Sequence, residues 1–178
     1  MISFSAAALR AGAVFAVCLS SPAFAQKAPS LSEPSLTTAT FADWTQRCVR
    51  ETESVVCEVM QTLKMEGQTA PVAQIAIGRI TPKAPLRLTI ILPVNASFDR
   101  GPQMQIEETP ASQANLGWRR CANFGCVADL EIRPEVLAAW RIAAKPGQIA
   151  FRNAANQDVV LPFSFRGLAQ ALDAMPKG

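Results

Sequence analysis

Most of the chain after residue 41 alternates between apolar and polar side chains with a period of two. In residues 86–92 every second side chain is Leu or Ile, with Arg87 and Thr89 between them, and residues 126–132 and 159–165 alternate in the same way. Further strand candidates are residues 55–63, 72–80 and 148–153. Strands with one buried and one wet face are typical of antiparallel sheets. Seven or more short strands with turn residues between them predict a sandwich or barrel.

Two segments have a helical period instead. Residues 134–144 begin with Pro and place Val136, Leu137 and Trp140 at three- and four-residue spacing. Residues 166–175 place Leu and Met side chains on one stripe, which predicts a terminal helix over the core. Both are short enough to need packing against the sheets for stability. The pattern therefore predicts a mainly β protein with two short helices towards the C-terminus.

The first 25 residues have the pattern of a secretory signal peptide. Arg10 precedes the apolar run 11–19 (AGAVFAVCL), and Ala23-Phe24-Ala25 forms an A-x-A cleavage site before Gln26. The run is shorter than the roughly 20 residues that span a bilayer. We therefore predict export with cleavage between Ala25 and Gln26. Cys18 leaves open a lipoprotein alternative, although the residues just before it fit that cleavage poorly.

The mature chain divides into a leader and one domain. Residues 26–40 are mostly Pro, Ser, Thr and Ala, with too little apolar surface to offset the entropy of ordering, so we predict a flexible leader. Residues 41–178 then form a single domain, which is long enough to bury its own core. No other stretch reaches spanning length, so we predict a mature protein without a transmembrane span.

Composition excludes several functions. The sequence has 17 Lys+Arg and 14 Asp+Glu, and removing residues 1–25 with their single Arg leaves a net charge of +2 (16 minus 14). This charge is too mild to indicate nucleic-acid binding. The chain contains no His and no Tyr. Catalytic triads, Cys–His pairs and zinc sites with a His ligand are therefore excluded.

Four cysteines remain after cleavage, and an even number in an exported chain predicts two disulfides. Four cysteines allow three pairings, but the spacing favours Cys48 with Cys57 and Cys121 with Cys126, each across one hairpin. Two-residue turns at 52–53 and 123–124 would place the partners directly opposite each other, within disulfide reach. Trp44 lies four residues before Cys48 on the same strand face, so we predict that it is buried beside that bridge.

The sequence gives only weak indications of redox, metal-binding or acid–base chemistry. Arg119 and Arg120 would lower a thiol pKa and so leave a redox role open for Cys121–Cys126, but the spacing is not C-x-x-C and no helix is predicted to begin there. A four-cysteine metal site is disfavoured because the two pairs are far apart in an oxidising compartment. The acidic pairs Glu107–Glu108 and Asp129/Glu131 fit solvated strand faces. We predict no catalytic residue, no metal and no cofactor.

Four separated segments resemble one bacterial family, the invasion-associated locus B proteins. The segments are Phe41-Ala42-Asp43-Trp44 with Cys48; Pro85 to Pro93; Cys121 with Gly125-Cys126-Val127-Ala128; and Ser164 to Leu168 with Ala171-Leu172. The resemblance implies an exported envelope protein with an immunoglobulin-like β-sandwich, linked by name to host-cell invasion. It carries over the cysteines and Trp44 as framework positions, and no catalytic residue.

These observations favour a non-catalytic envelope protein in the periplasm or at the outer surface. We expect it to act by binding an envelope or host-surface macromolecule, because a sandwich presents loops and edge strands as binding surfaces. Two alternatives stay open. A small-ligand carrier would need an apolar pocket with a few convergent polar groups, and a thiol oxidoreductase would need a reactive cysteine.

Overall fold

A computed structural model describes residues 34–52, 54–65, 67–106 and 113–176 of the chain. The described residues belong to one compact unit. The predicted signal peptide, and the predicted leader up to residue 33, lie outside the described residues.

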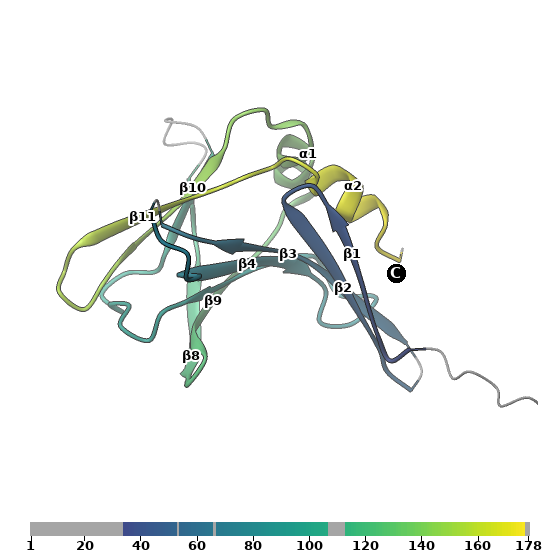
Figure 1. Ribbon diagram of the computed structural model, residues 1–178, viewed down its shortest axis with the longest axis horizontal. Helices are drawn as coiled ribbons and strands as arrows, with labels where there is room; N and C mark the ends of the chain where they lie inside the picture. The colour runs from purple at the N-terminus through teal and green to yellow at the C-terminus, as the bar shows by residue number, and fades with distance from the viewer. Residues whose placement is uncertain (1–33, 53, 66, 107–112, 177–178) are drawn as a thin grey trace, which may run out of the picture. The chain divides into compact units, whose positions relative to one another are not determined.

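The larger sheet has seven antiparallel strands in the order β1-β2-β3-β4-β5-β9-β8 (Figure 1). The strands are β1 (Leu36–Phe41), β2 (Trp44–Arg50), β3 (Val55–Leu63), β4 (Ala73–Gly78), β5 (Arg87–Leu92), β8 (Gly117–Ala122) and β9 (Gly125–Glu131). β3 has the bounds that the sequence predicts, and β4, β5 and β9 differ from prediction by one or two residues at an end. Alternate residues of these strands are buried, which is the physical basis of the period-two pattern.

The smaller sheet has four antiparallel strands in the order β11-β10-β6-β7. The strands are β6 (Gln103–Gln105), β7 (Gln113–Asn115), β10 (Gly147–Arg152) and β11 (Asp158–Phe163). Ile149 and Leu161 face each other in the β10–β11 register, and both are fully buried. The apolar side chains of this sheet join those of the larger sheet in one core, which contains Trp44, Ile75 and Ile90. The predicted mainly β antiparallel sandwich is therefore confirmed.

Two short helices complete the fold, as predicted. α1 (Pro134–Ile142) has Pro at its first helical position, where a missing N–H costs nothing, and buries Trp140. α2 (Leu168–Asp173) buries Leu168 and two neighbours on one face. Arg141 of α1 donates a hydrogen bond of 2.5 Å to Asp173 of α2.

The predicted start of the domain at Phe41 is wrong by five residues (41 minus 36), because β1 begins at Leu36. Residues 36–40 are exposed, so no buried face marks them as a strand in the sequence. The segment is ordered by main-chain pairing with β2, from Leu36 opposite Val49 to Phe41 opposite Trp44. β6 and β7 were not predicted either, since three polar-rich residues are too few to show an alternation.

Gly167 connects the end of the small sheet to α2 and fixes its approach to β1. Its φ is +91°, and a Cβ at this position would lie 1.9 Å from the carbonyl oxygen of Phe41. Only glycine fits both the left-handed backbone and the close approach. Arg166 beside it donates two hydrogen bonds to the Asp43 carboxylate, at 2.8 and 3.1 Å. The start and the end of the domain are therefore held together at this point.

Candidate functional site

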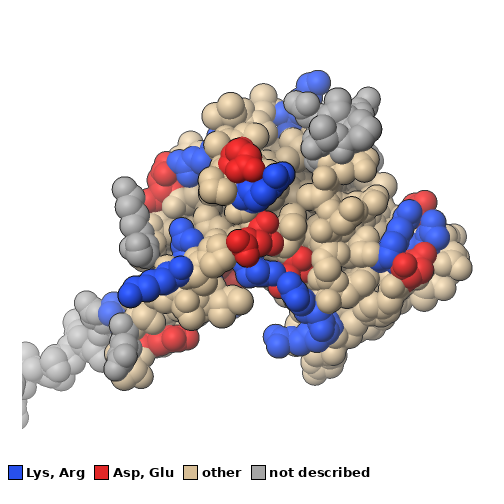
Figure 2. Space-filling view, turned by 180° about the vertical axis from the view of Figure 1, so that it is seen from behind, with Lys and Arg blue, Asp and Glu red and all other residues tan. Residues whose placement is uncertain are grey.

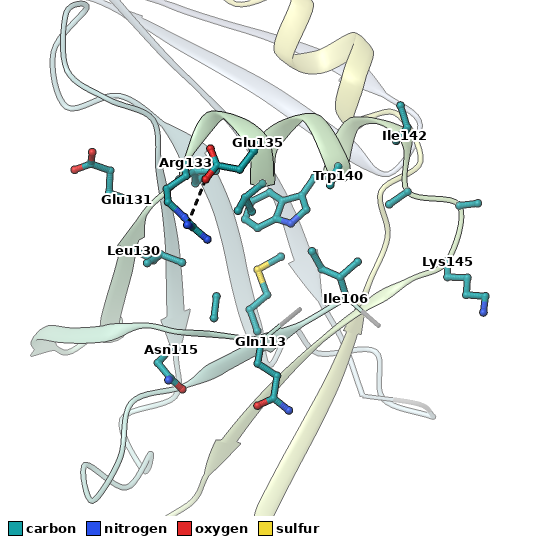
Figure 3. A pocket seen from close by; sticks show the side chains of 17 residues that line it. Ile106, Gln113, Asn115, Leu130, Glu131, Arg133, Glu135, Trp140, Ile142 and Lys145 are labelled. Atoms are coloured by element: carbon teal, nitrogen blue, oxygen red, sulfur yellow. Dashed lines mark ion pairs between the residues drawn. The ribbon is translucent and has the colours of Figure 1, made fainter. Parts of the chain in front are cut away.

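A cavity of about 870 Å³ lies between helix α1, the end of β9 and the short strands β6 and β7 (Figure 3). This volume is in the range of small-molecule sites, roughly 300–1,000 Å³. Most of the lining is apolar, and its buried part is formed by Met104 of β6, Ile132 after β9 and Trp140 of α1. Ile106, Leu130 and the half-buried face of α1 form the walls.

Trp140 forms part of this cavity and has an unusual polar atom. Its side chain is 1% exposed, and its indole Nε1 has no hydrogen-bond partner among the described residues. In Figure 3 the indole nitrogen lies on the side of the ring that faces Ile106. A buried donor without an acceptor costs about 1–3 kcal/mol, so an unsatisfied N–H here is a feature that needs an explanation.

Charged side chains stand at two ends of the cavity. Arg133 and Glu135 form an ion pair of 3.3 Å at the start of α1, and Glu131 lies nearby on β9 (Figure 3). Lys145 lies beyond the C-terminal end of α1, on the opposite side of the view. Within the described ranges, Lys145 makes no ion pair. The two ends therefore differ: at one end Arg133 is paired with Glu135, and at the other Lys145 has no acidic partner among the described residues.

Sequence reasoning placed Trp140 only as a core residue of a helix and did not find the cavity. The sequence did contain one indication of a special site at Trp140, because the N–H of a buried Trp usually needs a hydrogen-bond partner. The strands opposite the helix were not predicted, so nothing in the sequence could show that a cavity lies between them.

A second candidate surface is the tip of the β8–β9 hairpin. Phe124 in the turn is 58% exposed, and Val94 after β5 is 63% exposed. Both line one recess of about 720 Å³ at the same end of the larger sheet. Gly125 holds this tip against β5, since its φ is +140° and a Cβ would lie 2.6 Å from the carbonyl oxygen of Leu92. Steric contact with β5 therefore explains why the residue before Cys126 is a glycine.

The cysteines lie where the spacing predicts. Cys48 is directly opposite Cys57 in the β2–β3 register, and Cys121 is opposite Cys126 in the β8–β9 register. In the structure both pairs are disulfides, with Cα atoms 4.0 Å apart in each pair. Trp44 is fully buried, and its Nε1 donates a hydrogen bond of 2.8 Å to the carbonyl oxygen of Ser164.

Asp129 lies in an arginine network on the outer face of the larger sheet and not in a catalytic pair. Its Oδ1 accepts hydrogen bonds from Arg87 at 2.6 Å and from Arg119 at 2.7 Å. Burial acts to raise the pKa of Asp129, but the two arginines outweigh it and hold the pKa below its ordinary value. Glu131 is 3.8 Å from Arg87. Arg119 thus pairs with a carboxylate, and Glu107–Glu108 lie outside the described residues.

The described residues contain neither a group of metal-ligating side chains nor a membrane-spanning helix. In residues 34–52, 54–65, 67–106 and 113–176, no three Cys, Asp or Glu side chains are grouped so as to hold a metal ion. No helix in that part of the chain has the length and apolar character needed to cross a bilayer. On the face shown in Figure 2, red and blue side chains lie beside one another at several places, and one group of blue side chains extends to the lower edge of the molecule.

The fold and these sites define a disulfide-containing, antiparallel β-sandwich with a cavity under its first helix. The sequence matches the family described as Invasion associated locus B (IalB) protein over residues 44–176, and the chain belongs to this family. It is 24% identical over 139 residues to invasion protein B homologs of Brucella abortus strains 2308 and 9-941, covering 75% of this chain and 76% of each relative. The crystal structure of invasion associated protein b from Bartonella henselae has the same fold, with a TM-score of 0.65 and 18% identity over 77% of this chain and 92% of that chain.

Proposed function

We propose that this protein is an exported, non-catalytic component of the cell envelope that acts by binding another macromolecule. Its family membership supports an invasion-associated role in the envelope or at the host surface. The signal-peptide pattern with its A-x-A site at Ala25 supports export, and two disulfides suit an oxidising compartment. The absence of His throughout the sequence leaves general acid–base chemistry without its usual residue.

The observation that carries the binding proposal is the exposed Phe124 on a hairpin closed by Cys121–Cys126. Aromatic side chains near the centre of an interface commonly carry much of its affinity. A hairpin held by a disulfide and by the Gly125 contact is already ordered, so docking loses little conformational entropy. Val94 alongside extends the apolar patch.

The test is crosslinking in the envelope with variants of this patch. Partners captured by the wild-type protein are compared with those of the double variant Val94→Ser/Phe124→Ser. Ile80→Ser is the matched control, because Ile80 is also an exposed apolar side chain but does not line this recess. We expect the double variant to lose the partner and the control to keep it. Equal capture by all three proteins would reject this docking surface.

Export is tested separately, by cell fractionation and N-terminal sequencing. The expected mature N-terminus is Gln26 in the periplasm, at the outer surface or in the medium. A chain that keeps Met1, or a lipid-modified Cys18, would contradict the proposed cleavage and relocate the protein to the cytoplasm or a membrane.

The cavity under α1 favours a second candidate function, a carrier of a small apolar ligand. Its volume and its mainly apolar lining are what such a site requires. Native mass spectrometry of protein purified from the envelope would detect a bound ligand. A mass equal to that of the bare polypeptide with two disulfides would argue against a retained one.

A further inference from the structure

We propose that the cavity under α1 binds one acyl chain that carries acceptor oxygens and a negative charge, as in a long-chain carboxylate or a monoacyl anionic lipid. This inference rests on the second candidate function and not on macromolecular docking at Phe124. Two features of the cavity select this chemistry: its apolar body, and Lys145, which has no acidic partner among the described residues.

The apolar body fits a flexible hydrocarbon chain. The lining combines Met104, Ile106 and Ala114 of the β6–β7 side with the apolar face of α1. Ile142 at the end of that helix is 85% exposed while lining the cavity, so the apolar surface continues out to the solvent. An apolar surface that includes Met104 suits a chain of methylenes, because methionine adapts to irregular apolar shapes.

The charged side chains at the two ends of the cavity favour a ligand with a negatively charged head group. At one end of the cavity Arg133 is already paired with Glu135. At the other end Lys145 has no acidic partner in the described part of the chain, and it stands where the exposed Ile142 opens to solvent. An anionic head at Lys145 completes an ion pair there, while a cationic head would find no free carboxylate at that end among the described residues.

The experiment is isothermal titration of purified, delipidated protein with decanoate, laurate and myristate, each below its micelle concentration. Because each buried methylene contributes about fourfold in affinity, we expect dissociation constants to fall steeply along the series. Absent binding, or affinities independent of chain length, would overturn the proposal.

Cavity occupancy is tested with two neighbouring alanines of α1. Ala139 lines the cavity and Ala138 does not, although both are exposed. Ala139→Trp should reduce laurate affinity at least tenfold, and Ala138→Trp should leave it within about twofold. Thermal melts check that both variants fold. If Ala139→Trp does not fold, Ala139→Leu obstructs the cavity with a smaller side chain. Equal effects at 138 and 139 would place the ligand elsewhere.

The head-group contact is tested with charge reversal. Lys145→Glu should weaken laurate about two- to tenfold and leave dodecanol unchanged, since only laurate carries the charge. Lys83→Glu is the control, because Lys83 is exposed and does not line the cavity. An equal loss for laurate and dodecanol, or for both lysine variants, would reject the ion pair.

The source of the chain is separated by comparing laurate with monolauroyl phosphatidylglycerol. Tighter binding of laurate indicates a free carboxylate, and tighter binding of the phospholipid indicates a membrane-derived ligand; both outcomes support the shared chemistry. Failure of every probe would overturn this inference while leaving docking at Phe124 untouched, because Phe124 and the cavity share no lining residue.

Discussion

The side-chain amide of Gln61 and the main chain of Ser164, 103 residues apart, exchange two hydrogen bonds. Ser164 N donates to Gln61 Oε1 at 2.8 Å, and Gln61 Nε2 donates to the Ser164 carbonyl at 3.4 Å and to the Asp43 carbonyl at 3.1 Å. The Ser164 carbonyl also accepts from Trp44. Strand β3 of the larger sheet is thereby joined to the segment that follows β11 of the smaller one.

Gln61→Leu should destabilise the protein by about 1–3 kcal/mol, because it leaves the part-buried Ser164 N–H without its acceptor and removes the hydrogen bond to the Asp43 carbonyl. Gln46→Leu is the matched control: Gln46 is equally buried, but its Nε2 has no hydrogen-bond partner among the described residues. Removing that amide should be neutral or stabilising. Urea unfolding measures the stability of both variants. Equal losses of stability would contradict the hydrogen bonds assigned to Gln61.

Trp44→Ala should cost about 3–5 kcal/mol, as expected for a large buried side chain replaced by a small one. Trp44→Phe keeps most of the packing and removes only the hydrogen bond to Ser164, so its cost should be nearer 1 kcal/mol. Guanidinium unfolding distinguishes the two. A loss below about 1 kcal/mol for Trp44→Ala would mean that the side chain is exposed in solution.

Removing either disulfide by paired Cys→Ser changes should lower stability by about 2–3 kcal/mol, because the loops closed are short, with separations of 9 and 5 residues. Peptide mapping of non-reduced protein measures the pairing, and a Cys57–Cys121 link would contradict it. A redox role for Cys121–Cys126 predicts instead that the protein reduces a test disulfide and that Cys121→Ser abolishes this.

The contribution of Asp129 to stability should depend on pH. The pKa of Asp129 is lower in the folded protein than its ordinary value of 3.8, so the contribution is present above the unfolded-state pKa and is lost as pH falls through the folded pKa. The difference in unfolding free energy between wild type and Asp129→Asn should therefore be largest near pH 7 and narrow below about pH 4. An unchanged difference at pH 2.5 would contradict the Arg87 and Arg119 hydrogen bonds.

Gly167→Ala should be strongly destabilising, by more than about 2 kcal/mol, since the new Cβ meets the Phe41 carbonyl and the backbone is left-handed. Gly117→Ala is the control, because the nearest atom to its added Cβ is 4.0 Å away. Thermal unfolding of the two variants checks this. A small effect at Gly167 would show that α2 approaches β1 less closely.

Strands with one buried face were predictable from sequence, and β3 is the clearest case. The register of each cysteine hairpin was predictable too, because pairing positions follow from the number of residues in a tight turn. β1 was missed because the exposed residues 36–40 take their order from pairing with β2 and carry no pattern of burial.

The candidate sites were harder to predict, for a physical reason. Trp140 was identified as a helix core residue, but its missing hydrogen-bond partner depends on which strands face it. Phe124 was identified only as a turn residue, and its place beside Val94 depends on β5 pairing with β9. Both sites arise between segments distant in sequence, which a periodic pattern does not record.

The central claim, macromolecular docking at the disulfide-closed hairpin, is tested most directly by site-specific photocrosslinking in living cells. A photoreactive phenylalanine analogue replaces Phe124 in one strain and the exposed Ile80 in another. We expect a discrete, light-dependent adduct of higher mass from position 124 and none from position 80. No adduct at 124, or the same adduct from both positions, would contradict it.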